Sequence, residues 1–131
     1  MSCLFCAIIA GELPSRRVFE DDSAVAFLDI NPWQAGHTLV VPRRHVDDLL
    51  DPNEALSEIA PAISSTARLL VDRLAADGLN LLSSARGVAG QEVFHLHVHL
   101  IPRYADKPGI RGMIGRSVDD LDQVYARLSR S

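Results

Sequence analysis

Three histidines at alternate positions in one apolar segment constrain the fold of this chain more than any other feature. The segment FHLHVHLIPRY, residues 94–104, sets His95, His97 and His99 among apolar residues. Because alternate side chains of a β-strand point to the same side, the three imidazoles are predicted to share one face. Phe94, Leu96, Val98 and Leu100 then share the other face and are expected to pack against a helix.

The spacing argues against one metal ion held by all three histidines. Same-face residues lie roughly 6.8 Å apart along a strand, which separates the Cα atoms of His95 and His99 by about 13.6 Å. Zinc–nitrogen bonds of about 2 Å do not easily close that span. Several imidazoles together instead suit acyl or phosphoryl transfer, because histidine titrates near neutral pH and is a good nucleophile. The alternative is that the histidines are merely solvated residues of a strand. The presence of three of them on one face disfavours that alternative.

Length and composition indicate one ordinary globular domain. The 131 residues are 47% hydrophobic and carry a formal net charge of -4. The basic residues are scattered, which excludes long nucleic acid as a favoured partner but allows a small phosphorylated ligand. No apolar run approaches the ~20 residues needed to span a bilayer, and a signal peptide pattern is absent. We therefore expect a cytoplasmic single domain over 1–131, with a core of about 3–104 and a helical tail of about 117–129.

The order of the predicted elements favours an α+β fold with an antiparallel sheet, because a doubly wound parallel sheet needs a helix between most strands. Strands are predicted at residues 17–21, 24–30, 37–42, 79–85 and 93–102. One long helix is inserted among them, with Asp51 as its cap and Gly78 at its end. Its apolar residues at helical spacing are Leu56, Ile59, Ile63, Ala67, Leu70 and Leu74.

Short helices are predicted at both ends of the chain. In the first, LFCAIIAG, the residues expected to face inward are Leu4, Ile8 and Ile9. In the second, from Ser117 onward, the apolar face consists of Val118, Leu121, Val124, Tyr125 and Leu128. Both patterns have the spacing of an amphipathic helix.

Candidate phosphate contacts lie just upstream of the histidine segment. In AGQE, residues 89–92, the backbone N–H groups and the Gln91 amide are suited to phosphate oxygens. His37, in GHT, adds a further histidine, whereas the P-loop and GxGxxG patterns are absent. Asp29 follows an apolar strand, so its carboxylate either binds an external partner or caps the turn at Asn31.

The two cysteines, Cys3 and Cys6, have the spacing of zinc ligands. A disulfide between them would close only a tiny loop and would stabilise the fold little. Zinc binding, thiol redox chemistry and plain burial remain as interpretations. The redox reading expects a strand–helix context of the thioredoxin kind, which this segment lacks.

The segment HLHVHLI resembles the His-x-His-x-His-x-x signature, with apolar x, of the histidine triad (HIT) nucleotide-binding proteins. The resemblance extends over CLFCAIIAGELPS, AFLDINPWQAGHTLVVPRRH and GQEVFHLHVHLIPR, in the family's order and across most of residues 3–104. The chain looks most like the small Hint-type branch. The resemblance implies a HIT-like antiparallel sheet of about five strands, one long central helix, short flanking helices and a homodimer.

The resemblance also assigns catalytic roles. His97 corresponds to the histidine that attacks the α-phosphorus of a nucleotide derivative, giving a nucleotidyl-histidine that water hydrolyses to a nucleoside monophosphate. His99 and Gln91 correspond to phosphate contacts, and His37 to the family's additional active-site histidine. The implied substrates are purine nucleoside phosphoramidates, adenylates or dinucleoside polyphosphates, with no catalytic metal. The alternatives are a nucleotide-binding regulatory module with little turnover and a zinc hydrolase that uses metal-bound water.

A nucleoside pocket follows from the same resemblance. Asp29 matches the acidic residue that binds the ribose hydroxyls. The apolar wall around the base corresponds to Phe5, Ile8, Phe27 and Ile30, for which core packing is the alternative. Ser84 falls where many relatives carry Asn and is expected to offer a hydroxyl to the substrate. Glu92 falls where some relatives carry Ser or Thr, so its charge is expected to affect which leaving group is accepted.

A structural zinc ion is implied by members of the family that bind it through an N-terminal CxxC and two histidines. The matching residues here are Cys3, Cys6, His45 and His95. Four protein ligands leave no position for substrate, so such a zinc is expected to stabilise the fold rather than to catalyse. Two buried thiols without a metal are the alternative.

Overall fold

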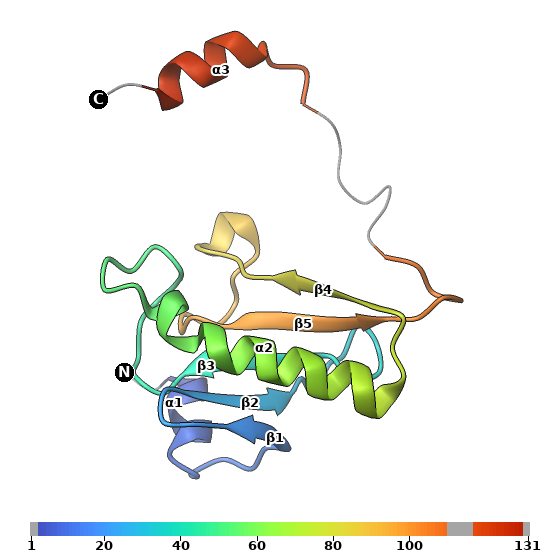
Figure 1. The fold of residues 1–131 in the computed structure, drawn as a ribbon. Coiled ribbons are helices and arrows are strands. Elements are labelled where there is room, and N and C mark those ends of the chain that lie inside the picture. Colours follow the sequence, from blue (N-terminus) through green and yellow to red (C-terminus); the bar gives the residue numbers. More distant parts are fainter. Residues whose placement is uncertain (1–2, 110–116, 130–131) are drawn as a thin grey trace.

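The centre of the protein is a five-stranded antiparallel sheet with the strand order β1-β2-β3-β5-β4 (Figure 1). The computed structural model describes residues 3–109 and 117–129. Its strands are β1 Arg17–Glu20, β2 Ala24–Leu28, β3 Thr38–Pro42, β4 Gly78–Leu82 and β5 Val98–Arg103. The helices are α1 Leu4–Ile9, α2 Ala55–Leu74 and α3 Leu121–Leu128, with a short 3-10 helix η1 at Gly87–Ala89. The predicted α+β class and antiparallel sheet are confirmed.

Two apolar cores cover the two faces of the sheet. On one face α2 lies along the sheet (Figure 1), and its Ile59 shares a core with Ala26 and Val40. On the other face α1 packs through Phe5 against Phe27. Alternate residues of β2 and β3 therefore enter different cores. This arrangement explains why both strands are buried along nearly their whole length and read as continuous apolar runs in the sequence.

Helix α2 begins later than predicted, and its buried stripe is rotated. Asp51 does not cap the helix; its carboxylate accepts a hydrogen bond from the Asn53 N–H (3.1 Å) in a preceding turn. Leu56 and Leu74, predicted to face the core, are 37% and 40% exposed. The buried residues are Ala55, Ile59, Ala62, Thr66 and Leu70. Small residues at most of these contacts let the helix lie close to the sheet, while the outer leucines flank the contact.

The terminal helices differ from the prediction in the residues that they bury. In α1 the buried side chains are Phe5 and Ile8, whereas Leu4, one turn before Ile8 at the start of the helix, is 50% exposed. In α3 no residue is buried, and Leu121 and Leu128 are 84% and 79% exposed. The predicted α3 helix is present, but its apolar face does not enter either core.

Strand β5 begins at Val98, so His95 and His97 precede the strand instead of lying within it. The ladder with β3 ends at the pair Val40–Val98. Pro42, two residues further along β3, has no N–H to continue the ladder, and its carbonyl instead lies 2.8 Å from Nε2 of His95.

The predicted apolar side of the histidine segment is confirmed for Leu96, Val98 and Leu100, which are buried in the α2 core. Phe94 is the exception, since it is 54% exposed ahead of the strand. None of the helices within the described parts of the chain is long and apolar enough to cross a membrane.

Candidate active site

A cavity of about 720 Å³ opens on the α1 face of the sheet. Its walls come from α1, the end of β2 with the following loop, and the segment between β4 and β5. The predicted site residues that line it are Phe5, Ile8, Phe27, Asp29, Ile30, Ser84, His97 and His99. Ile30 is 82% exposed and therefore belongs to the mouth of the cavity, whereas Phe5 and Phe27 form a buried wall.

The ring of His97 is held in one orientation by main-chain and aromatic contacts. Its Nδ1 lies 2.8 Å from the carbonyl oxygen of His95. Because a carbonyl only accepts, the proton of the neutral ring lies on Nδ1, and Nε2 then has the lone pair. The Ser83 hydroxyl donates to the carbonyl of His97 itself (2.8 Å). Phe5 meets the His97 ring edge-on, with centroids 5.1 Å apart and an interplanar angle of 84°.

His37 and His99 form a hydrogen-bonded pair whose tautomers follow from one backbone donor. The main-chain N–H of Trp33 donates to Nδ1 of His37 (3.0 Å), so the proton of neutral His37 resides on Nε2. That Nε2 lies 2.9 Å from Nδ1 of His99 and donates to it. The proton of neutral His99 is thereby placed on its own Nε2. His37 is 1% exposed and is not among the residues that line the cavity, but it contacts His99, which is.

Burial keeps both rings neutral. It lowers the pKa of His37, and the nearby Asp29 carboxylate only partly opposes this effect. Burial also lowers the pKa of His99 to about 4, with further lowering from His97 and His37 and opposition from Asp29. Neutral rings are what the hydrogen-bond chain requires, since a protonated His99 has no lone pair at Nδ1 to accept from His37.

Asp29 combines the two roles that its sequence context allowed. One carboxylate oxygen accepts from the N–H of Asn31 (2.8 Å) and so caps the turn. The other lies 3.6 Å from Nε2 of His37, and the residue lines the cavity. Asp29 therefore has capacity left for an external hydroxyl.

Gln91 lies beneath the segment that lines the cavity instead of within the cavity. The side chain is 4% exposed and is not among the lining residues. Its Nε2 donates to the carbonyls of Asp47 (2.6 Å) and Val93 (3.1 Å), and its Oε1 accepts from the N–H of Arg86 (2.6 Å). Both amide protons are thus engaged by protein atoms. Arg86 has a φ of 77°, so Gln91 stabilises a left-handed position that a non-glycine residue seldom adopts.

The charged side chains that line the cavity are acidic. Within the described residues the lining includes two carboxylates, Asp29 and Glu92, and neither lysine nor arginine. A phosphoryl group in this cavity would therefore be met by imidazole N–H groups and backbone N–H groups rather than by a full positive charge.

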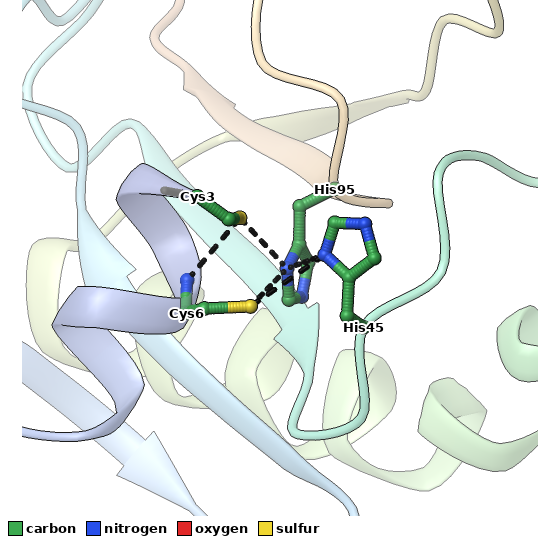
Figure 2. A group of neighbouring side chains, drawn as sticks. All are labelled: Cys3, Cys6, His45 and His95. Carbon is green, nitrogen blue, oxygen red and sulfur yellow. Dashed lines mark hydrogen bonds between the residues drawn. The ribbon is translucent and has the colours of Figure 1, made fainter. Parts of the chain in front are cut away.

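A second cluster brings together Cys3, Cys6, His45 and His95 (Figure 2). Nδ1 of His95 lies 3.4 Å from Sγ of Cys3 and 3.5 Å from Sγ of Cys6. Nδ1 of His45 lies 3.5 Å from Sγ of Cys6 and 3.2 Å from Nδ1 of His95. The four donor atoms come from α1, from the turn after β3 and from the segment before β5.

These distances fit a tetrahedral zinc site. With Zn–S bonds of about 2.3 Å and Zn–N bonds of about 2.0–2.1 Å, a regular tetrahedron separates sulfur from nitrogen by about 3.5 Å and two nitrogens by about 3.3 Å. The outward nitrogens of the histidines are also occupied. Nε2 of His95 donates to the Pro42 carbonyl (2.8 Å), and Nε2 of His45 to the Asp47 carboxylate (3.0 Å). Both lone pairs at Nδ1 are thereby aimed at the thiols.

The cysteines would bind a metal only on losing their protons. Burial raises the pKa of the Cys6 thiol, and the neighbouring Cys3 raises it further. Both cysteines are free of disulfide bonds. Metal binding at this cluster is therefore expected to release protons and to weaken as the pH falls.

Three residues near the site were not predicted from the sequence. Trp33 is the only tryptophan of the chain and stands four residues before His37. This spacing is visible in the sequence, but it does not by itself indicate a contact between the two residues. Asp47 follows His45 by two residues, a spacing at which a carboxylate can reach an imidazole. Ser83 adjoins Ser84, and nothing in the sequence distinguishes the serine that holds His97 from the one that lines the cavity.

Comparison with known proteins agrees with this arrangement. Residues 10–106 match the family model of the HIT domain. The protein named Protein hit from Bacillus subtilis is 40% identical over 120 residues, which are 91% of this chain and 83% of that protein. The adenylylsulfatase HINT3 of Arabidopsis thaliana is 36% identical over 102 residues, 77% of this chain and 52% of that protein.

A crystal structure gives the same result for the fold. The histidine triad nucleotide-binding protein from Candida albicans superposes with a TM-score of 0.81 at 32% identity, covering 97% of this chain and 92% of that one. The family model, the sequence identity and the likeness of the fold thus agree, and this chain belongs to the histidine triad (HIT) family.

Proposed function

We propose that the protein is a nucleotide hydrolase or transferase that attacks the α-phosphorus of a nucleotide conjugate through His97 and releases a nucleoside monophosphate. The observation that carries the proposal is the hydrogen bond between Nδ1 of His97 and the carbonyl of His95 (2.8 Å). In the neutral ring this bond sets the tautomer that leaves the lone pair on Nε2, which is the form that a nucleophile needs, and His97 lines the cavity.

The reaction follows in two displacements. Nε2 of His97 forms a bond to phosphorus as the bond from phosphorus to the leaving group breaks, and the leaving group departs with the electron pair of that bond. The ring becomes a phosphorylated imidazolium, whose positive charge is stabilised by the His95 carbonyl at Nδ1. A water molecule then attacks phosphorus and releases one proton to solvent, while the P–N bond breaks and its electron pair returns to Nε2. The nucleoside monophosphate leaves, and the neutral ring is restored.

His99 is suited to the charge that develops on the phosphoryl oxygens. Its neutral ring carries a proton on Nε2, and the residue lines the same cavity as His97. Their ring centroids are 5.0 Å apart. An N–H held in place before the reaction stabilises the transition state without reorganisation, which is the largest contribution in many enzymes.

The nucleoside is expected to occupy the remainder of the cavity. Phe5 and Phe27 offer an apolar wall for a purine, with ring centroids 5.5 Å apart. Asp29 has a carboxylate oxygen available for the ribose hydroxyls. Among the implied substrates are nucleoside phosphoramidates, adenylates and dinucleoside polyphosphates, and the relationship to an adenylylsulfatase supports the adenylates.

The experiment compares wild type with His97→Ala on a panel of adenylylated substrates. Wild type is expected to release AMP, and a slow phosphorothioate substrate is expected to leave a nucleotide on His97 that mass mapping detects. The H97A variant should lose turnover but still bind AMP in calorimetry. If wild type binds AMP and turns over none of the panel, the protein is a nucleotide-binding module instead of an enzyme.

We also propose that the Cys3–Cys6–His45–His95 cluster holds a structural zinc ion. The spacing of the four donor atoms and the occupied outward nitrogens of both histidines support this proposal. When bound, the metal ties α1 to the segment that carries His97. One zinc per chain is expected in metal analysis, and removal by a chelator should lower the melting temperature. A zinc hydrolase would instead lose its activity on chelation while the fold stays intact.

A homodimer is the assembly implied by the family resemblance. The edge strand β4 supports it, because Leu81 and Leu82 are 57% and 44% exposed on a strand that has only one neighbouring strand within the described residues. Exposed apolar residues on an edge strand favour pairing with another chain. Sedimentation analysis of wild type and Leu81→Asp tests this proposal, and a monomeric wild type would contradict it.

A further inference from the structure

Trp33 lies in the loop between β2 and β3, at the mouth of the cavity. It is 58% exposed and lines the cavity together with Asp29 and His99. Large apolar side chains are usually placed by burial in a core, but more than half of this indole remains exposed. Its position therefore depends on the loop backbone and on the rings that it touches.

The loop is fixed at several points by hydrogen bonds. The N–H of Asp29 donates to the carbonyl of His37 (3.0 Å), and the N–H of His37 donates to the carbonyl of Gln34 (3.0 Å). The hydroxyl of Tyr104 donates to the carbonyl of Ala35 (2.9 Å). These contacts make the loop a defined support for Trp33 at the edge of the sheet.

Trp33 touches both members of the histidine pair. Its main-chain N–H donates to Nδ1 of His37 (3.0 Å). Its indole stacks on the imidazole of His99, with centroids 5.1 Å apart and an interplanar angle of 11°. The indole also lies 4.8 Å from the His37 ring at an angle of 40°. One residue thus contacts the first ring of the pair through its main chain and the second ring through its side chain.

We infer that Trp33 is a positioning residue for the His37–His99 pair: its main-chain N–H sets the tautomer of both rings, and its indole fixes the plane of the His99 ring. The tautomers of both rings and the plane of the His99 ring are properties of the protein without substrate. Their effect on turnover rests on the proposed function. Trp33 acts through His99 and is not itself required to touch the reacting phosphorus.

Two restraints are needed because each leaves a different freedom open. A terminal torsion such as χ2 of histidine has broad wells, so the single hydrogen bond at Nδ1 of His99 allows the ring to tilt about that contact. A stacked aromatic neighbour opposes this tilt, because such ring pairs are stabilised by more than the area that they bury. The direction of the Nε2–H of His99 is therefore set by the indole and the hydrogen bond together.

The first experiment reads the tautomers directly in the wild-type protein. Nitrogen-15 NMR of histidine-labelled protein near neutral pH is expected to show an unprotonated Nδ1 and a protonated Nε2 for both His37 and His99. A protonated Nδ1 on His37 would overturn the inference, because the Trp33 N–H would then have no acceptor there. This measurement requires no substrate and no turnover.

The second experiment compares Trp33→Phe with Trp33→Ala, and uses Phe94→Ala as a control. Phe94 has a similar exposed fraction (54%) but does not line the cavity. In W33A, kcat is expected to fall roughly ten- to a hundredfold through misplacement of His99, with a smaller change in KM. W33F keeps an aromatic ring on His99 and should recover most of kcat. Equal losses in W33F and W33A, or no loss in either, would overturn the inference.

The third experiment uses Trp33 as its own reporter, because it is the only tryptophan in the chain. A protonated imidazole in contact with an indole quenches the fluorescence of the indole, so protonation of His99 should lower the emission of Trp33. The titratable groups that face His99 are His97, His37 and Asp29. Acidification should quench the emission with a midpoint of about 4, where His99 titrates, and His99→Asn should remove this step. A step that persists in H99N would come from His37 instead, and would contradict the contact of the indole with His99 as the source of the quenching.

The outcomes separate this inference from the proposed function. Wild type that shows the expected tautomers and quenching but hydrolyses no adenylylated substrate would contradict only the proposed function. Wild type that hydrolyses the substrates while W33A keeps full kcat and an unchanged His99 titration would contradict only the role of Trp33.

Discussion

The main-chain carbonyl of His95 accepts a hydrogen bond from Nδ1 of His97 across 2.8 Å, while the side chain of His95 belongs to the cysteine–histidine cluster. One residue therefore serves the cluster through its imidazole and orients its neighbour through its backbone. A displacement of His95 would also move the acceptor that holds His97. The geometry of the cluster and the aim of the proposed nucleophile are coupled by this single residue.

The Asp47 carboxylate is expected to strengthen metal binding through His45, to which it lies 3.0 Å away. Loss of such an outer carboxylate typically costs 10- to 100-fold in metal affinity. We expect Asp47→Asn to weaken zinc binding by about that factor in competition with a chromogenic chelator. Asp48→Ala removes a neighbouring carboxylate that contacts the Leu50 N–H instead and serves as the control. Equal affinities of both variants would contradict a role for Asp47.

Gln91 is expected to contribute to stability more than to phosphate binding. Gln91→Ala leaves the Asp47 carbonyl and the Arg86 N–H without their side-chain partner. The free energy of unfolding should fall by about 2–3 kcal/mol, because buried polar groups lose their hydrogen bonds. Gln91→Glu retains the acceptor for Arg86 but places a buried carboxylate oxygen against the Asp47 and Val93 carbonyls, so it should lose at least as much. Urea denaturation measures both; a Q91A variant of wild-type stability but weak phosphate affinity would favour direct substrate contact.

Ser83 and Ser84 are expected to have separable roles. Ser83→Ala removes the hydrogen bond to the carbonyl of His97 (2.8 Å), so kcat should fall by roughly fivefold, equivalent to about 1 kcal/mol, with little change in KM. Ser84→Ala changes a residue that lines the cavity and should act mainly on KM. Steady-state kinetics on one adenylylated substrate distinguishes them. The reverse pattern, with KM sensitive to Ser83, would show that the hydroxyl of Ser83 reaches the substrate.

The neutral rings of His37 and His99 are expected to make stability depend on pH. Burial holds the pKa of both below the ordinary value, to about 4 for His99. Between about 6.5 and about 4 the unfolded chain therefore binds more protons than the folded one, and the stability falls as the pH is lowered through this window. Melting temperatures measured across it should decline less steeply in His99→Asn than in wild type. Parallel curves would mean that His99 does not titrate differently on unfolding.

The sheet and the grouping of the histidines were predictable because both follow from local patterns. The alternation of His95, His97 and His99 with buried residues identified the polar side of the segment correctly. The residue at which strand β5 begins was not predictable from that alternation, because Pro42 in strand β3 terminates the ladder between β3 and β5. A residue's partner across the sheet carries information that the segment itself does not contain.

The same limitation applies to side chains whose role depends on tertiary contacts. The sequence around Gln91 is suited to phosphate binding, but its amide is engaged by Asp47, which lies far away in the chain. The leucine spacing of α2 indicated a helix but not its rotation, because the small residues Ala62 and Thr66 determine how close it lies to the sheet. Trp33 could be located in a loop, but its contact with His99 exists only in the folded chain.

The absence of lysine and arginine from the described lining of the cavity affects how a charged ligand reaches it. Long-range attraction accelerates the capture of anions only where the site carries opposite charge. Here the ligand would be recognised by short-range hydrogen bonds and apolar contact, which salt screens much less than it screens exposed charges. Because Asp29 and Glu92 repel an anionic nucleotide and salt screens this repulsion, the association rate should rise slightly with ionic strength instead of falling.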